Sequence, residues 1–112
     1  MNDLTGQLRT HPEDPQRLVA DLPSPRVQAH AANLMVLKDG TLACVWFGGS
    51  MEGKSDICVF MSRLAAGSSQ WSEPVQLSSD PDRSEQNPIL FPAPNGDLWL
   101  LHTAQSAGHQ DT

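Results

Sequence analysis

The stretch from Ala31 to Gly49, AANLMVLKDGTLACVWFGG, contains two apolar runs joined by a turn. The first run, 31–37, is almost continuously apolar, as expected for a strand that is buried on both faces. Asp39 and Gly40 form a typical two-residue hairpin turn, and 41–49 is the returning strand. The stretch therefore predicts an antiparallel hairpin at the centre of a sheet.

Strand signals continue on the C-terminal side of this hairpin. The run 56–64 is rich in β-branched and aromatic residues, which predicts a third strand. The run 71–79 predicts a fourth strand, and Pro74 places it at an edge because proline cannot donate a ladder hydrogen bond. A polar segment, 80–87, then reads as a loop. The sequence so far predicts one four-stranded antiparallel sheet.

A second hairpin follows that loop. Apolar runs at 88–94 and 97–105 flank a turn at Asn95 and Gly96, a strong signal for a short hairpin connection. The polar residues directly before the first of these runs are unusual, because a strand normally starts after one or two turn residues. We expect this polar segment to have a role of its own.

The two hairpins form an internal repeat. Each has an asparagine, an apolar strand, a turn with glycine and a second apolar strand. Gly40 and Gly96 are 96 − 40 = 56 residues apart, and Asn33 and Asn87 are 87 − 33 = 54 apart. Four short antiparallel strands in a unit of about 50 residues are typical of a β-propeller blade. A six-stranded sandwich with a coincidental similarity is the alternative.

Composition limits the class of protein. The chain has 112 residues with nine prolines and eight glycines, which fits one small turn-rich domain. The net charge of −6 and the scattered basic residues argue against a nucleic-acid partner. No apolar run has membrane-spanning length, and the N-terminus has no apolar signal core, so we expect no membrane partner and a cytoplasmic location. Cys44 and Cys58 are expected to be buried, reduced thiols, and no metal or cofactor is expected.

The N-terminal segment differs from the rest of the chain. Residues 1–25 are polar and contain four prolines, which predicts an arm or linker. The short apolar stretch Arg17–Leu22 could add an edge strand. The strand signals begin after it, so we expect the domain proper to occupy residues 26–112.

Residues 26–112 resemble the sialidase-like propellers with Asp-box (BNR) repeats. The matching features are a Gly-Thr-Leu turn, an Asp-Ile strand start, Ser-Arg, Gly and Trp-Ser in the first unit, and Asn-Pro and Trp-Leu-Leu in the second. They stand at Gly40–Leu42, Asp56–Ile57, Ser62–Arg63, Gly67, Trp71–Ser72, Asn87–Pro88 and Trp99–Leu101. The resemblance implies an all-β fold, a partial propeller with one four-stranded blade and the inner hairpin of a second.

Three departures from the family pattern qualify the function. A full Asp-box is Ser-x-Asp-x-Gly-x-Thr-Trp, and Leu64 stands at the Asp position here. His30 stands where the family has the first of three arginines that hold a substrate carboxylate as a bidentate pair. The chain has no tyrosine, the sialidase nucleophile. The resemblance therefore implies a glycoside hydrolase acting on a sugar other than sialic acid, or a non-catalytic sugar-binding or scaffolding module.

The polar residues at the starts of the inner strands are the candidate site. In a propeller these starts face the end where ligands bind, and amides beside a carboxylate suit sugar hydroxyls. The expected catalytic residues are His30, Glu85 and Asp56, and the expected substrate-binding residues are Asn33, Gln86, Asn87, Arg26 and Glu52. His102, Gln105 and Gln110 could reach the same rim. Each of these residues could instead serve only the fold, as a hydrogen-bonded or solvated side chain.

The predicted two units are fewer than the six or so blades of such propellers. Either the chain is a truncated part of a larger propeller, or several copies assemble a ring. The expected partners are therefore a carbohydrate and further copies of the chain.

Overall fold

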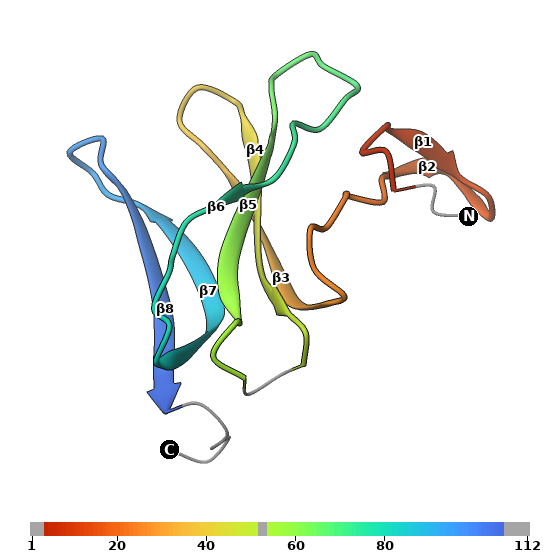
Figure 1. Ribbon diagram of the computed structural model, residues 1–112. Helices are drawn as coiled ribbons and strands as arrows, with labels where there is room; N and C mark the ends of the chain where they lie inside the picture. Colours follow the sequence, from red (N-terminus) through yellow and green to blue (C-terminus); the bar gives the residue numbers. More distant parts are fainter. Residues whose placement is uncertain (1–3, 52–53, 107–112) are drawn as a thin grey trace.

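The computed structural model describes residues 4–51 and 54–106. All regular elements in these residues are β-strands, so the all-β prediction is confirmed (Figure 1). The strands are β1 (Arg9–His11), β2 (Asp14–Val19), β3 (Gln28–Val36), β4 (Leu42–Gly49), β5 (Cys58–Leu64), β6 (Val75–Gln76), β7 (Arg83–Pro92) and β8 (Leu98–Ser106). They form three antiparallel sheets: β1–β2, β3–β4–β5–β6 and β7–β8.

The four-stranded sheet has the strands in chain order, with β4 inside. Val45 of β4 pairs with Asn33 on one side and with Met61 on the other. β4 is buried along nearly its whole length, whereas β3 is largely exposed and includes Leu34 at 61% exposure. The prediction that 31–37 is buried on both faces is therefore wrong. The reason is that β3 forms an edge of the sheet, and the returning strand β4 takes the central place.

The fourth strand is much shorter than predicted. Regular pairing with β5 covers Val75–Gln76, directly after Pro74, instead of 71–79. Before the proline, the Trp71 N–H donates to the carbonyl of Gly6 and the Ser72 N–H to the carbonyl of Arg63. Before Pro74, the chain is thus bonded to β5 through Ser72 and to the N-terminal segment through Trp71, and the proline interrupts a continuous ladder with β5.

The second hairpin begins earlier than predicted. β7 starts at Arg83, so residues 83–87, expected as the end of a loop, belong to the strand. Ser84, Glu85 and Gln86 pair with Gln105, Ala104 and Thr103 of β8, and all three are buried. Polar side chains hid this strand because sequence patterns identify strands through apolar residues.

The internal repeat has a constant offset of 56 residues. Both inner strands contain a bulge, between His30 and Asn33 in β3 and between Gln86 and Ile89 in β7. Each bulge holds a non-glycine residue with positive φ, Ala31 (55°) and Asn87 (53°). Because 87 − 31 = 56, Asn87 is the counterpart of Ala31, and the predicted match of Asn33 with Asn87 is corrected. The turn glycines, Gly40 (φ 88°) and Gly96 (φ 98°), keep the same offset.

The two larger sheets pack face to face through a small apolar cluster, which we call the seam. It contains Ala43, Val45, Met61 and Leu90, with Leu100 partly buried against it. Ala43 and Val45 have no exposed surface, because β7–β8 covers this face of β4 together with side chains such as Met35 and Leu77. Burial of this apolar surface is the main force that holds the second sheet against the first.

The opposite face of the four-stranded sheet carries a second cluster. Trp46, Phe60 and Trp71 are buried there together with both cysteines. Ala20 and Leu22 of the N-terminal segment pack against this cluster. Backbone bonds reinforce the contact, since the Leu8 N–H donates to the carbonyl of Ser69 in addition to the Trp71–Gly6 bond.

The β1–β2 hairpin extends beyond this contact and lies apart from the two larger sheets (Figure 1). It covers 9–19, whereas the sequence suggested an edge strand at Arg17–Leu22. An ion pair of 2.7 Å between Arg9 Nη2 and Asp21 Oδ2 joins the two arms of this segment on the surface. The division of the chain at residue 25 stays a prediction.

Candidate functional site

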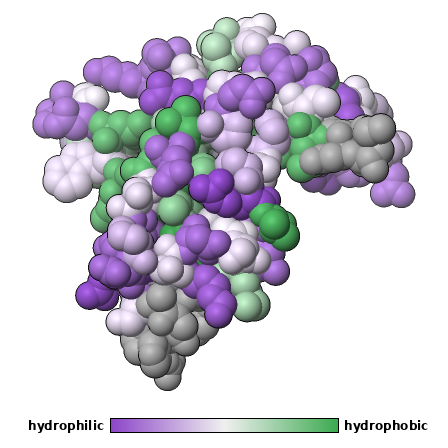
Figure 2. All heavy atoms as spheres, viewed as in Figure 1, coloured by the Kyte–Doolittle hydropathy of each residue, from purple (hydrophilic) through white to green (hydrophobic). Residues whose placement is uncertain are grey.

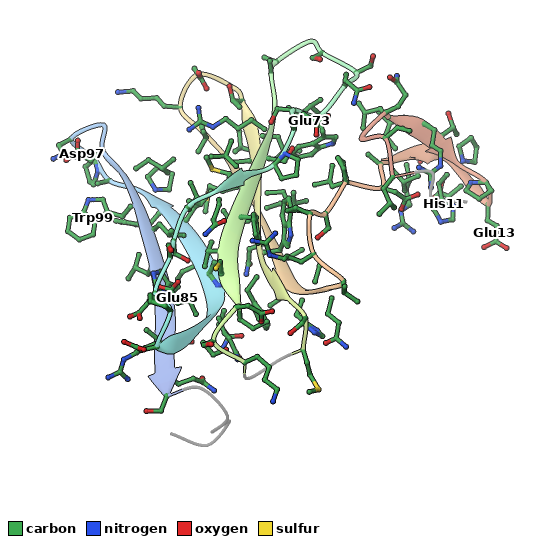
Figure 3. All side chains as sticks on the ribbon, in the orientation of Figure 1. His11, Glu13, Glu73, Glu85, Asp97 and Trp99 are labelled. Atoms are coloured by element: carbon green, nitrogen blue, oxygen red, sulfur yellow. The ribbon has the colours of Figure 1, made fainter. Side chains whose placement is uncertain are left out.

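The starts of β3, β5 and β7 meet at the end of β4, and we call this region the polar end. Gln28 pairs with Gly49, and Cys58 pairs with Gly48. The Glu85 N–H donates to the carbonyl of Ile57 at 3.1 Å, which joins the start of β7 to the start of β5. The opposite end consists of the hairpin turns. Figure 3 shows Glu85 far from Asp97 and Glu73, which mark the turn end.

Close packing at Gly49 positions one side of the polar end. A Cβ atom at this residue would lie 2.8 Å from Asp56 Oδ1 and 2.8 Å from Ile57 Cδ1. Only glycine therefore allows the loop after β4 to fold back on the start of β5. The Ser50 N–H donates to Asp56 Oδ2 at 3.1 Å and holds the carboxylate in this loop.

Glu85 is the most unusual side chain at the polar end. It is 6% exposed, and its Oε1 has no hydrogen-bond partner among the described residues. Its Oε2 lies 3.9 Å from His102 Nε2, which is an ion-pair distance but too long for a hydrogen bond. A buried carboxylate normally has its oxygens satisfied, because desolvation without a partner is costly. Glu85 therefore has spare capacity to accept a hydrogen bond.

The hydrogen bonding of His102 determines whether the ring nitrogen that faces the Glu85 carboxylate carries a proton. Its Nδ1 lies 2.9 Å from the carbonyl oxygen of Thr103, which can only accept, so Nδ1 carries the proton. Nε2 can then donate toward Glu85 only when the ring is doubly protonated. In the neutral ring, Nε2 presents a lone pair toward the carboxylate instead. His102, one of the rim candidates from the sequence, is thus brought within ion-pair distance of Glu85 by the fold.

Strand alternation assigns His30 and Glu85 to the seam faces of the two larger sheets, and His30 also lines a hollow beside the N-terminal segment. His30 pairs with Phe47, which alternation places on the same face of β4 as the seam residue Val45. Its ring lies 5.2 Å from the Phe47 ring, and its Nε2 is 3.4 Å from Gln28 Oε1. Glu85 shares its face of β7–β8 with Leu100 through its cross-strand neighbour Ala104. The predicted acid–base pair therefore comes from two facing sheets.

The predicted amide residues have structural contacts. Asn33 Nδ2 donates to the carbonyl of Pro88 at 3.1 Å and thus links the two sheets. Gln86 is buried, and its side-chain Nε2 donates to Ser84 Oγ at 2.8 Å. Its backbone carbonyl accepts a hydrogen bond from Thr103 Oγ1 at 3.1 Å. Asn87 is exposed at the bulge, where its left-handed backbone suits asparagine. Their binding roles stay predictions.

Arg26 and Asp56 lie together at a separate cavity of about 390 Å³. Ser55, Cys58, Ser79 and Asp80 also line it, and Glu85 does not. The Arg26 guanidinium lies over the Phe60 ring, with Cζ 5.1 Å from its centroid, so it is packed as well as charged. Glu52 and Gln110 lie outside the described residues.

The charges of Glu85 and Arg26 both affect the Cys58 thiol, which lies at the polar end. Burial raises the pKa of the Cys58 thiol, the negative charge of Glu85 raises it further, and the positive charge of Arg26 opposes the rise. Burial alone raises the pKa of the Cys44 thiol. Both thiols are free and buried, which makes them poor nucleophiles.

The described residues hold no cluster of three potential metal ligands among His, Cys, Asp and Glu. In 4–51 and 54–106 there is also no helix long and apolar enough to cross a membrane.

The turn between β5 and β6 explains the degenerate Asp-box. Ser62 is buried, and its hydroxyl donates to the carbonyl of Ser72 at 2.6 Å. Ser72 Oγ in turn accepts from the Arg63 N–H at 2.9 Å. Gly67 supplies a positive φ of 80° in the turn, and Trp71 packs into the core. The serine, glycine and tryptophan of the motif therefore keep structural functions, while Leu64 replaces the acidic residue.

These observations define an all-β protein with repeated antiparallel hairpins and a serine-anchored turn. The model of the BNR repeat-like domain matches residues 40–112, which is more than half of the chain. The chain belongs to this family, and the resemblance to sialidase-like BNR-repeat proteins is confirmed. Comparisons with curated proteins and with solved structures give no match.

Proposed function

We propose that the chain forms part of a sialidase-like β-propeller. In this arrangement β3–β6 is one blade, and β7–β8 is the inner hairpin of the next. The constant offset of 56 residues supports it, because the second hairpin repeats the bulge and the turn of the first. The face-to-face packing of the two sheets through the seam also agrees with neighbouring blades.

We further propose that the polar end of the seam binds and processes a carbohydrate. The observation that carries this proposal is the Glu85 carboxylate, which is buried beside His102 with one oxygen lacking a partner among the described residues. A sugar hydroxyl is a neutral donor that would satisfy this oxygen. His30 stands at the position of the family's first arginine, so we propose a sugar other than sialic acid as the substrate.

In the hydrolytic form of the proposal, Glu85 and His30 share acid–base work. A carboxylate can act as the general base that activates the attacking water, and a second group, here His30, can protonate the leaving oxygen of the glycosidic bond. His30 and Glu85 come from the two sides of the seam, which suits groups that act on opposite sides of one bond. Asn33, Gln86 and Asn87 would hold the sugar around them.

One observation favours a second candidate, sugar binding without hydrolysis. Most glycosidases use two carboxyl groups, and the sole ion-pair contact of Glu85 within the described part of the chain is with a histidine. The carboxylate of Asp56 is engaged by the Ser50 N–H and lines a different cavity. A binding module needs no second carboxyl group, and in it Glu85 would act as one acceptor beside the amide residues around it.

The two candidates and the site can be tested together. The chain is offered a panel of aryl glycosides, and binding of the free sugars is measured by calorimetry. We expect Glu85→Gln to lower hydrolysis about 100-fold or more, or to weaken binding about tenfold or more if no sugar is cleaved. Glu73→Gln, an exposed carboxylate at the turn end, is the matched control and should change neither value.

Each result selects one reading. Cleavage that depends on Glu85 supports the hydrolase, and binding without cleavage supports the sugar-binding module. Activity or binding that Glu85→Gln leaves intact would show that the site lies elsewhere. A chain that neither binds nor cleaves any sugar of the panel would contradict both candidates.

A further inference from the structure

The outer face of the β7–β8 sheet is apolar and open. Its four large side chains are half exposed: Ile89 (49%), Phe91 (52%), Trp99 (57%) and Leu101 (46%). With Pro94 and its neighbours they line a shallow hollow of about 680 Å³. Figure 2 shows apolar side chains gathered over β7 and β8, and Figure 3 shows Trp99 pointing away from the four-stranded sheet. We call these four residues the outer face.

The internal repeat shows what kind of surface covers such a face. With the offset of 56 residues, the position equivalent to Trp99 in the first hairpin is Ala43, and the position equivalent to Leu101 is Val45. Ala43 and Val45 belong to the seam, where they are fully buried and pack with Leu90 and Leu100 of β7–β8. The outer face is therefore the repeat equivalent of a surface that is buried against another sheet.

The matching surface is also present in the chain. The side chains that cover the seam from the second sheet are Leu90 and Leu100. Their equivalents, 56 residues earlier, are Leu34 and Cys44 on the far face of the four-stranded sheet. Both line an open, mostly apolar groove of about 740 Å³ between this sheet and the N-terminal segment, in which Leu34 is 61% exposed and Cys44 is buried.

We propose that the outer face of one copy docks against this groove of a second copy, so that chains associate head to tail. The contact would repeat between copies the packing that the seam makes within one chain. Such a heterologous contact closes into a ring or extends, depending on the rotation between copies. It would place the polar ends of successive copies side by side.

The composition of the outer face favours a protein partner over a sugar. Exposed tryptophan can stack on a sugar ring, but a sugar site also needs donors and acceptors for the hydroxyl groups. The hollow is lined almost entirely by apolar groups, with Asn95 as its polar residue among those described. An apolar sheet face of this kind suits another sheet. The inference does not depend on the proposed sugar chemistry.

The test measures the molar mass of the full chain by light scattering over a range of concentrations. We expect the mass to rise with concentration for the unaltered chain. Trp99→Glu breaks the outer face, and Leu34→Glu breaks the groove; each variant alone should stay monomeric. An equimolar mixture of the two should form a one-to-one dimer, because one intact face and one intact groove remain. Val27→Glu, at an 89% exposed site that lines neither the groove nor the hollow of the outer face, is the control and should behave as the unaltered chain does.

Circular dichroism tests whether each variant keeps its sheets; we expect that it does, because Leu34 and Trp99 are both exposed. Three results would overturn the proposal. The first is a chain that stays monomeric at every soluble concentration. The second is association that Trp99→Glu leaves intact, as pairing along the β8 edge would give. The third is association that Trp99→Glu abolishes and Leu34→Glu does not, which would mean that two outer faces pack on each other symmetrically.

Discussion

At the scale of single residues, Glu85 combines two properties that rarely occur together. It is buried between two sheets, and one of its oxygens has no partner within the described residues. A carboxylate in this state costs folding free energy, which a bound ligand would offset. The sequence predicted a role for Glu85 from its place before an apolar strand. It could not predict the burial, which arises because β7 extends back to Arg83 and packs its polar start against Ile57.

The cost of this carboxylate leads to a prediction on stability. Glu85→Gln removes the buried negative charge and keeps the shape of the side chain. We expect the free energy of unfolding to rise by about 1 kcal/mol, since an unsatisfied buried group carries a penalty of this order. Urea unfolding followed by tryptophan fluorescence measures the change. Glu73→Gln, exposed to solvent, should stay within about 0.5 kcal/mol of the unaltered chain. A clear loss of stability in Glu85→Gln would mean that the carboxylate is well satisfied and has no spare acceptor.

At the scale of elements, turns were easier to predict than bulges. The turns at Asp39–Gly40 and Asn95–Gly96 stand where the sequence placed them, because glycine in a short polar pair is a strong local signal. The first loop has three residues instead of the predicted two, since the Gly40 N–H donates to the Leu37 carbonyl and the Leu37 N–H to the Thr41 carbonyl. The bulge at Ala31 gives no such signal, since alanine disfavours positive φ. The sequence pattern therefore matches Asn33 with Asn87, whereas the register of the sheets matches Ala31 with Asn87.

The two bulges provide a matched pair of substitutions. Ala31 has φ 55° and Asn87 has φ 53°, but asparagine tolerates this conformation better than alanine does. We expect Ala31→Gly to raise the free energy of unfolding by a few tenths to about 1 kcal/mol, because relief of strain exceeds the entropy that glycine loses. Asn87→Gly should change it by less. The measurement is the urea midpoint of each variant. Equal effects at the two positions, or a loss at Ala31, would contradict this account of the bulges.

At the scale of the whole molecule, the sequence predicted the β-class and the repeat but not how the sheets are covered. Each large sheet has one face in the seam and one face turned outward. On the four-stranded sheet, the N-terminal segment covers part of the outward face with Ala20 and Leu22. The polar residues and prolines of this segment predict an arm. The packing of Ala20 and Leu22 against a distant cluster leaves no periodic pattern in the sequence, so the sequence does not predict this contact.

A substitution in this N-terminal segment tests whether the segment is a loosely attached arm or a packed part of the domain. Leu22 packs against the cluster of Trp46, Phe60 and Trp71, so Leu22→Asp should lower the free energy of unfolding by about 1–2 kcal/mol. Leu18, on the same segment but 64% exposed, is the matched control, and Leu18→Asp should cost less than about 0.5 kcal/mol. Urea unfolding of the two variants gives both values. If they are equal and small, residues 4–22 are an arm, and the face beneath them is available to another sheet along its whole length. If Leu22→Asp alone is costly, the segment is part of the domain, and the docking groove is limited to the part of this face near Leu34.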